Sequence, residues 1–150
     1  FEGLDKARPA DGINRFNAEK QRALLIAPSN RFVSIDPILG IPKLRETFIG
    51  SCHVKLAVSP IVGGIAIKGP AAKIMTELAM SVSAQGWTQW FDQRYPGLVD
   101  TWVWDKEDQA ALSEAEASAC RVRFAQTIMA DPKPAGAFAD WLIEECLGVD

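Results

Sequence analysis

The stretch of sequence that decides the fold is VKLAVSPIVGGIAIKGPAAKIMTEL, residues 54–78. It opens with a largely apolar run, 54–58, which predicts a buried strand. A loop rich in proline and glycine follows, and an amphipathic run at 71–78 comes directly after Pro70. Proline is favoured where a helix begins, because its φ is preset and its missing N–H would have no partner there. The stretch therefore predicts a strand, a glycine-rich loop and the start of a helix.

This layout suits an anion, because free backbone amides and the positive end of a helix dipole would face it. Gly63 and Gly64 would let a ligand approach the backbone closely, and Lys68 would add a positive charge. The order of residues matches neither the G-x-x-x-x-G-K-[ST] phosphate loop nor the dinucleotide G-x-G-x-x-G motif. A tight connection that uses glycine only for turning explains the same residues, so the loop alone leaves both interpretations open.

Composition narrows the class of protein. The chain has 150 residues, of which 48% are hydrophobic and 23% charged, values typical of one globular domain. A net charge of −3 gives no basic footprint for nucleic acid, and no apolar run approaches the roughly 20 residues of a membrane span. The cysteines (Cys52, Cys120 and Cys146) are far apart and lack metal-binding spacing, which favours a reduced, cytoplasmic protein. Because residue 1 is phenylalanine and 1–22 are polar, we expect a piece of a longer or processed protein.

The order of predicted elements indicates the fold class. We expect strands at 23–27, 54–58, 98–104 and 121–124. Helices are expected at 14–22, twice between Pro37 and residue 48, and then at 71–78, 84–94, 109–119 and from 131 onward. Strands that alternate with helices predict an α/β fold, a parallel sheet with helices on its faces.

Ligands of such folds bind beyond the carboxyl ends of the strands. The loops 28–37 and 59–70 both follow strands, so we expect them to share one crevice. Their small donors and cations suit phosphate oxygens, and the chain shows no Ser-His-Asp set and no cysteine beside a base, which favours phosphoryl or phosphodiester transfer. The candidate residues are Ser29, Asn30, Ser34, Ser59, Gly63, Gly64, Lys68, Gly69 and Lys73.

Long motifs in these loops resemble the 2-phospho-L-lactate transferase (CofD-type) family. They are IAPSNRFVSIDPIL (26–39) and AVSPIVGGIAIKGPAAKIM (57–75), with support from VSAQG (82–86) and FAQTIMADP (124–132). The resemblance covers nearly the whole chain but only the C-terminal half of the family. We therefore expect residues 1–150 to be the C-terminal half of a CofD-like domain whose N-terminal half has no counterpart here.

The resemblance implies a Rossmann-like fold, a homodimer and a role in coenzyme F-420 biosynthesis. It implies transfer of a phospholactyl or phosphoenolpyruvyl group from a GDP-activated donor to the ribityl hydroxyl of the deazaflavin Fo, with release of GMP and help from Mg²⁺. It places the P-S-N…S residues (Ser29, Asn30, Ser34) near the phosphates of the donor. The G-G…K-G residues (Gly63, Gly64, Lys68, Gly69), and less firmly Lys73, would surround the diphosphate.

Departures from the family pattern leave alternatives open. Arg31 stands where the family usually has proline, which would add charge and slacken the turn. Four tryptophans (Trp87, Trp90, Trp102 and Trp104) would face a deazaflavin or a dimer partner, or else fill the core, and the core interpretation is favoured. Asp36 is a candidate metal ligand, although a turn or capping role suits it better. A YvcK-like nucleotide-sugar-binding regulator and a non-catalytic nucleotide-binding fragment are the alternative functions.

Overall fold

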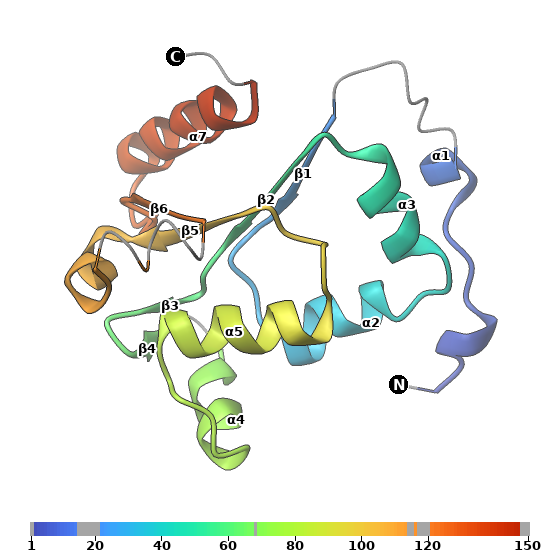
Figure 1. Cartoon of the computed structure of the whole chain (residues 1–150), viewed down its shortest axis with the longest axis horizontal. Coiled ribbons are helices and arrows are strands. Elements are labelled where there is room, and N and C mark those ends of the chain that lie inside the picture. The colour runs from blue at the N-terminus through green and yellow to red at the C-terminus, as the bar shows by residue number, and fades with distance from the viewer. Residues whose placement is uncertain (1, 15–21, 68, 114–115, 117–120, 148–150) are drawn as a thin grey trace.

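The computed structural model describes residues 2–14, 22–67, 69–113, 116 and 121–147 (Figure 1). The predicted helix at 14–22 lies almost entirely outside these residues, as do Lys68 and Cys120. A short helix, α1 (Asp11–Asn14), precedes that gap.

A four-stranded parallel sheet forms the centre of the molecule. Its strands are β1 (Ala23–Ile26), β2 (Val54–Val58), β5 (Thr101–Asp105) and β6 (Val122–Ala125), in the order β1-β2-β5-β6. All three neighbouring pairs are parallel, with Leu25 opposite Leu56 and Val58 opposite Val103. The predicted α/β class with a parallel sheet is confirmed.

The helices cover both faces of this sheet (Figure 1). On one face lie α2 (Asp36–Leu39), α3 (Leu44–Ser51), α4 (Ala71–Glu77) and α5 (Ala84–Arg94), and on the other lies α7 (Pro132–Leu147). Side chains alternate across β5 accordingly: Trp102 and Trp104 join the core under α5, whereas Val103 joins the core under α7. The Rossmann-like arrangement is therefore present in the described residues.

The tryptophans of β5 and α5 mostly belong to the core. Trp87, Trp102 and Trp104 are 1–2% exposed. The indole N–H of Trp104 donates to Thr88 Oγ1 at 3.0 Å, and that of Trp102 donates to both oxygens of Asp92 at 3.1 and 3.2 Å. The core interpretation is confirmed for these three by their burial, and the indole N–H groups of Trp102 and Trp104 are satisfied within the fold.

The loop after β2 differs from the prediction. Instead of running as an open glycine-rich loop, the chain folds into an antiparallel hairpin of β3 (Ile61–Val62) and β4 (Ile65–Ala66). Gly63 and Gly64 form its two-residue turn with φ of 56° and 76°. Positive φ at both turn positions suits the right-handed twist of a hairpin, and glycine adopts it without strain.

Two further boundaries were predicted wrongly. β5 begins at Thr101 rather than residue 98, because Leu98 N donates to Tyr95 O in a turn and the Leu98 side chain is buried in the core. After β5 the chain forms a 3-10 helix, η3 (Lys106–Ala111), where the predicted helix 109–119 was to begin, and most of 114–119 lies outside the described residues. The start of η3 is fixed by Asp105 Oδ1, which accepts from Glu107 N at 3.0 Å.

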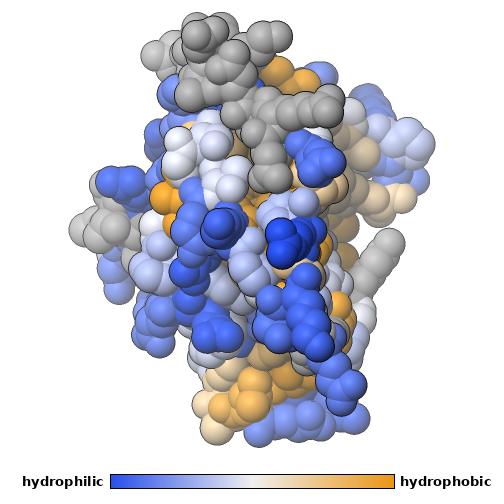
Figure 2. All heavy atoms as spheres, turned by 90° about the vertical axis from the view of Figure 1, so that its right-hand side faces the viewer, coloured by the Kyte–Doolittle hydropathy of each residue, from blue (hydrophilic) through white to orange (hydrophobic). Residues whose placement is uncertain are grey.

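The side of the molecule that carries α1 and α3 is mostly hydrophilic, with hydrophobic side chains gathered mainly at its lower end (Figure 2). Among the described residues no helix has both the length and the hydropathy needed to cross a membrane.

Phe91 offers a test of the core beneath α5. Its side chain is fully buried, and its ring centroid lies 5.1 Å from that of Tyr95 and 5.2 Å from that of Trp102. We expect Phe91→Ala to lower the free energy of unfolding by about 3–5 kcal/mol in urea denaturation. Gln89→Ala, at an exposed position of the same helix, should change it by less than about 0.5 kcal/mol. Equal effects of the two substitutions would contradict this packing.

Candidate functional site

A cavity of about 640 Å³ opens at the carboxyl edge of the sheet. Its walls come from the segments that follow β1, β2 and β6, as expected where parallel strands end together. The two loops predicted to share a crevice both contribute to it. The described residues that line it are Pro28, Ser29, Asn30, Pro60, Ile67, Gly69, Thr127, Ile128, Met129 and Ala130.

The wall after β1 is shaped by Asn30. This residue caps the π-helical turn η2 (Arg31–Ile35), and its Oδ1 accepts from Phe32 N at 3.0 Å. This hydrogen bond fixes the plane of the Asn30 side-chain amide. The Nδ2 atom of that amide is buried without a hydrogen-bond partner. A buried donor without a partner is costly, so an acceptor oxygen brought to this wall would be stabilised there.

The wall after β2 is the base of the hairpin. Pro60, Ile67 and Gly69 line the cavity there, and Ile67 N donates to Pro60 O at 3.1 Å, which holds the base closed. Ser59 is also at this base, but its hydroxyl serves the fold: it accepts from Ile61 N at 3.1 Å and donates to Ile61 O at 3.0 Å. Lys68, predicted to add the positive charge, lies outside the described residues.

Gly63, at the tip of the hairpin, faces acidic groups rather than the cavity. Gly63 N donates to Asp108 Oδ1 at 3.1 Å, and a Cβ on Gly63 would meet Glu107 Oε2 at 3.4 Å. Neither Gly63 nor Gly64 is among the described residues that line the cavity. An anion at this tip would meet the two carboxylates, so the tip is unsuited to a diphosphate.

Two other candidates also lie apart from the cavity. The Lys73 side chain is 78% exposed and its Nζ lies 3.8 Å from Glu77 Oε1, a pair along one face of α4. Ser34 is exposed and lines a separate hollow of about 260 Å³ beside β1, which Ser29 also borders. Of the predicted residues, the structure therefore brings together Ser29, Asn30 and Gly69.

The third wall, 127–130, was missed as part of the site. Thr127 is buried, and its backbone N and Oγ1 both donate to Asp105 Oδ2, at 2.7 and 2.8 Å. Burial alone would raise the pKa of Asp105, but hydrogen bonds from Glu107, Thr127 and Ile128 outweigh it and hold the pKa below its ordinary value. The sequence held two signals for this wall. One was Asp105 at the end of a strand, and the other was the T-I-M segment (127–129) within the family motif.

Asp108 supports the site from the other side of η3. It is 8% exposed, and Oδ1 accepts from Gly63 N while Oδ2 is buried without a partner. Burial raises the pKa of Asp108, and the nearby carboxylates of Asp105 and Glu107 add to that effect, against the Gly63 bond. The segment from Asp105 to Asp108 thus ties both the wall 127–130 and the hairpin to the end of β5.

Arg31 does not add charge to the cavity, contrary to the expectation from the sequence. Its side chain is fully buried against the rings of Trp90, Phe32 and Trp87, with the guanidinium carbon in contact with Trp90 and 4.1 Å from the Phe32 centroid. Burial lowers the pKa of Arg31 to about 9, although the Asp36 carboxylate opposes this. Arg31 therefore forms one cation–π cluster with Trp87 and Trp90, and all three residues depart from the family pattern.

The described residues offer no ligand set for a metal ion. No group of three or more His, Cys, Asp or Glu side chains among them could hold one. Asp36 is engaged elsewhere, since its Oδ1 accepts from the Tyr95 hydroxyl at 2.7 Å. Burial and this bond raise the pKa of Tyr95 to about 12. The side chain of Asp36 therefore joins α2 to the end of α5, which is neither the predicted capping or turn role nor a metal-ligand role.

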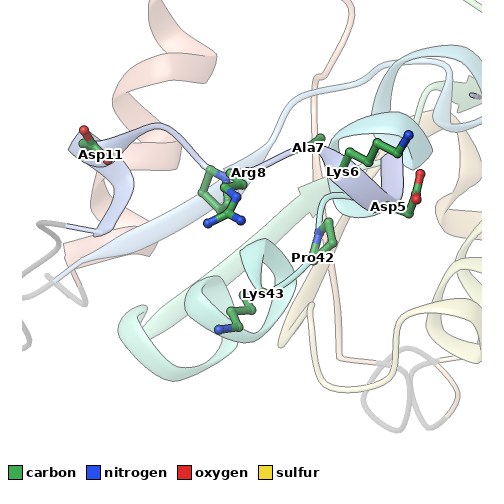
Figure 3. A pocket seen from close by; sticks show the side chains of 8 residues that line it. Asp5, Lys6, Ala7, Arg8, Asp11, Pro42 and Lys43 are labelled. Carbon is green, nitrogen blue, oxygen red and sulfur yellow. The ribbon is translucent and has the colours of Figure 1, made fainter. Parts of the chain in front are cut away.

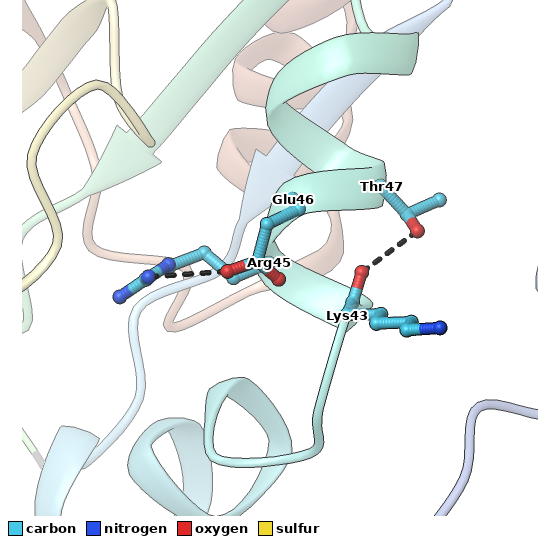
Figure 4. A network of polar contacts seen from close by, with 4 residues as sticks. All are labelled: Lys43, Arg45, Glu46 and Thr47. Carbon is cyan, nitrogen blue, oxygen red and sulfur yellow. Dashed lines mark hydrogen bonds and ion pairs between the residues drawn. The ribbon is translucent and has the colours of Figure 1, made fainter.

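A hollow of about 700 Å³ elsewhere is less suited to a site. It lies between the N-terminal segment and the connection from α2 to α3, where Lys6, Arg8 and Lys43 mix with Asp5 and Asp11 (Figure 3). Beside it, Thr47 Oγ1 donates to Lys43 O at 2.8 Å, which closes the first turn of α3 (Figure 4). Its described residues come from none of the strand ends, so the cavity lined by Asn30 and Thr127 is the better candidate.

Comparison with known proteins assigns the sequence of this chain to a family. A family model described as 2-phospho-L-lactate transferase CofD matches residues 15–134. The chain belongs to the CofD family. A 2-phospho-L-lactate transferase of Methanosarcina acetivorans is 32% identical over 125 residues, which make up 83% of this CofD-family chain and 39% of the relative.

Relatives named phosphoenolpyruvate transferase match the chain at a similar identity. A phosphoenolpyruvate transferase of Kitasatospora aureofaciens is 32% identical over 86% of the CofD-family chain and 39% of its own length. Another, from Streptomyces griseus, is 30% identical over 95% of the chain and 43% of its own length. The chain therefore spans about two-fifths of the length of the curated relatives that it matches.

The hydrogen bonds of Asp105 can be tested by Asp105→Asn. Both oxygens of this carboxylate accept hydrogen bonds, Oδ1 from Glu107 N and Oδ2 from Thr127 N and Oγ1, so an amide nitrogen in place of either oxygen must face a donor. We expect the free energy of unfolding to fall by about 1–3 kcal/mol, and the Thr127 amide to exchange its hydrogen faster. Denaturation and hydrogen exchange measure the two effects. A Thr127 amide equally protected in the variant would show that Asp105 does not hold this wall.

The acid branch of the stability curve gives a second readout. Because the folded pKa of Asp105 lies below its ordinary 3.8, its contribution is present above pH 3.8 and is lost as pH falls through the folded value. In Asp105→Asn the free energy of unfolding should therefore fall less steeply as the pH drops below 3.8. Asp140→Asn, the same substitution at an exposed position of α7, is the control. An unchanged acid slope in Asp105→Asn would exclude the depressed pKa.

Proposed function

We propose that this chain contributes the strand-end half of the active site of a transferase in coenzyme F-420 biosynthesis. The reaction moves a phospholactyl or phosphoenolpyruvyl group from a GDP-activated donor to the ribityl hydroxyl of the deazaflavin Fo, and GMP leaves. The observation that carries this proposal is the family match over residues 15–134, which includes both loops of the cavity. On this proposal residues 1–150 correspond to the C-terminal half of the family domain.

The described residues of the cavity suit positioning more than proton transfer. The hydroxyl of Fo attacks phosphorus, the bond to the GMP oxygen breaks, and the hydroxyl proton must leave. No side chain among the described lining residues is an acid or base, so their part is to orient oxygen atoms through Ser29, Asn30 and the Gly69 backbone. Orientation and stabilisation of developing charge are the main contributions to phosphoryl transfer.

The identity of the three-carbon acid is proposed only as a class. Relatives named for phospholactate and for phosphoenolpyruvate match at the same 32% identity, so the comparisons favour neither. The homodimer, the cytoplasmic location and Mg²⁺ implied by the resemblance stay predictions. We assign no step to Mg²⁺, because the described residues give it no cluster of carboxylates.

A non-catalytic nucleotide-binding role is the second candidate. The observation in its favour is that the chain spans only 39% of relatives named as transferases. The purified protein, incubated with Fo and a GDP-activated three-carbon acid, separates the two roles. Release of GMP with formation of the phosphodiester supports the transferase, whereas binding of GDP without GMP release supports the second candidate.

The lysines predicted around the diphosphate differ in a way that calorimetry with GDP can measure. Lys68→Ala should weaken GDP binding about tenfold to a hundredfold, as expected for a lost charge-assisted hydrogen bond. Lys73→Ala is the matched control, because its ammonium is exposed and near Glu77, and it should change affinity less than about twofold. Unchanged affinity in Lys68→Ala would remove Lys68 from the site.

A further inference from the structure

The hairpin beside the cavity has one buried strand and one exposed strand. In β3, Ile61 is fully buried and Val62 is 6% exposed, and Ile61 belongs to the core beneath α5. In β4, by contrast, Ile65 is 69% exposed. The exposed strand is the one that leads into Ile67 and Gly69, which line the cavity. One wall of the cavity is therefore carried by the outer strand of the hairpin.

The direction of β4 depends on the turn that precedes it. β4 has two residues and, in the part of the chain that the structure describes, it pairs only with β3. Gly63 opens the turn, and its backbone N donates to Asp108 Oδ1 at 3.1 Å, across 45 residues of sequence. A hydrogen bond at the first turn residue orients the turn and hence the strand that leaves it. Because α4 also contacts β4, loss of this bond would shift the hairpin rather than release it.

The carboxylate of Asp108 is poorly compensated where it lies. The residue is 8% exposed, and its Oδ2 is buried with no hydrogen-bond partner among the described residues. The nearby carboxylates of Asp105 and Glu107 add to the effect of burial in raising the pKa of Asp108. A buried charge with one hydrogen bond and like charges beside it costs stability. What the side chain provides is an acceptor at the hairpin turn, not a gain in stability.

Asp108 also lies on the element that holds the opposite wall. The 3-10 helix η3 begins directly after Asp105, whose Oδ2 accepts from the backbone N and Oγ1 of Thr127. The hairpin and the segment 127–130 are thus both attached to the end of β5, one through Asp108 and the other through Asp105. A displacement of the hairpin turn from Asp108 would therefore change the separation of the two walls.

We propose that Asp108 is a positioning residue, whose hydrogen bond to Gly63 orients the hairpin and so sets the place of Gly69 in the cavity. The inference rests on the proposed function where GDP is concerned, because Gly69 and the adjacent Lys68 are predicted to meet the diphosphate. Asp108 is not among the described residues that line the cavity, so it acts through the backbone of the hairpin. Displacement of a binding group by about 1 Å is enough to lose much of its effect.

Two substitutions separate the hydrogen bond from the charge. Asp108→Ala removes the acceptor, whereas Asp108→Asn keeps Oδ1 and removes the charge. Because Oδ2 has no partner among the described residues, an amide nitrogen can take its place without facing a donor. The asparagine variant should unfold at the same urea concentration as the unsubstituted protein or a higher one, since a buried charge is removed. Asp140→Ala, at an exposed position of α7, is the control.

Amide hydrogen exchange and ¹⁵N–¹H spectra report on the hairpin without any ligand. In Asp108→Ala the Gly63 amide should exchange at least about tenfold faster, and the Gly69 resonance should shift. The Ile61 amide, which donates to Ser59 Oγ at 3.1 Å, should keep its protection. Asp108→Asn should restore both the Gly63 protection and the Gly69 resonance. Equal acceleration at Gly63 and Ile61 would show a general loss of stability and overturn the proposal, and so would an unmoved Gly69 resonance in Asp108→Ala.

Calorimetry with GDP gives a second readout, in which two roles predict opposite signs. If Asp108 acted only as a negative charge near an anion, both substitutions would tighten GDP binding. A positioning role predicts that Asp108→Ala weakens binding about threefold to tenfold, whereas Asp108→Asn does not weaken it. An affinity that is unchanged or tighter in Asp108→Ala, or equally weakened in Asp108→Asn, would overturn the proposal.

Failure here and failure of the proposed function give different results. If the unsubstituted protein binds no GDP and releases no GMP, the proposed function fails, and the Gly63 and Gly69 signals still decide the role of Asp108. GMP release together with an unmoved Gly69 resonance in Asp108→Ala would retain the transferase and reject the positioning role.

Discussion

The structure depends on β5, a strand that is packed on both faces and hydrogen-bonded on both edges. Trp102 and Trp104 point into the core beneath α5, while Val103 points into the core beneath α7. Its neighbours β2 and β6 are both parallel to it, so the three strands must end on the same side of the sheet. Two large indoles on one face require a deep layer of helices there, and their N–H groups find partners in α5, at Thr88 and Asp92.

The end of the same strand connects this core to the candidate site. Asp105 is the last residue of β5, and its carboxylate accepts from the backbone and hydroxyl of Thr127 in the segment after β6. Three residues later Asp108 accepts from Gly63 at the tip of the hairpin. A buried carboxylate that accepts several hydrogen bonds is rigid, because any displacement leaves charge without a partner. The walls of the cavity are thus held by polar bonds from a strand that apolar packing has already fixed.

Much of this fold could be predicted from local pattern. The strand at 54–58 and the helix at 84–94 agree with β2 and α5 residue for residue, because each has continuous periodicity and clear boundaries. The hairpin was missed because I-V-G-G-I-A is short, and its glycines were explained equally well by a loop. The start of β5 was misplaced because Leu98 is apolar for a different reason, namely burial beside a turn.

The candidate site was predictable only in part, for a related reason. Ser29, Asn30 and Gly69 follow strands directly, and the topology brings them together. Thr127 and Met129 lie in a motif of the family resemblance, but their place in the cavity depends on the bond to Asp105, 22 residues away in the chain. Arg31 was expected to add charge to the turn after β1, but the rings of Phe32 and Trp90 pack against its guanidinium group.

The distribution of charge around the cavity indicates which part of the family domain could supply positive charge to a diphosphate. The described lining residues carry no charge, and the carboxylates nearby bind backbone groups rather than face the cavity. A diphosphate needs cations or many free amides to replace its hydration. Those must come from Lys68 or from parts of the family domain beyond the two-fifths that this chain spans. The segment after β6 and the hairpin base supply uncharged walls held by Asp105 and by the Ile67–Pro60 hydrogen bond, so their described contribution is shape rather than charge.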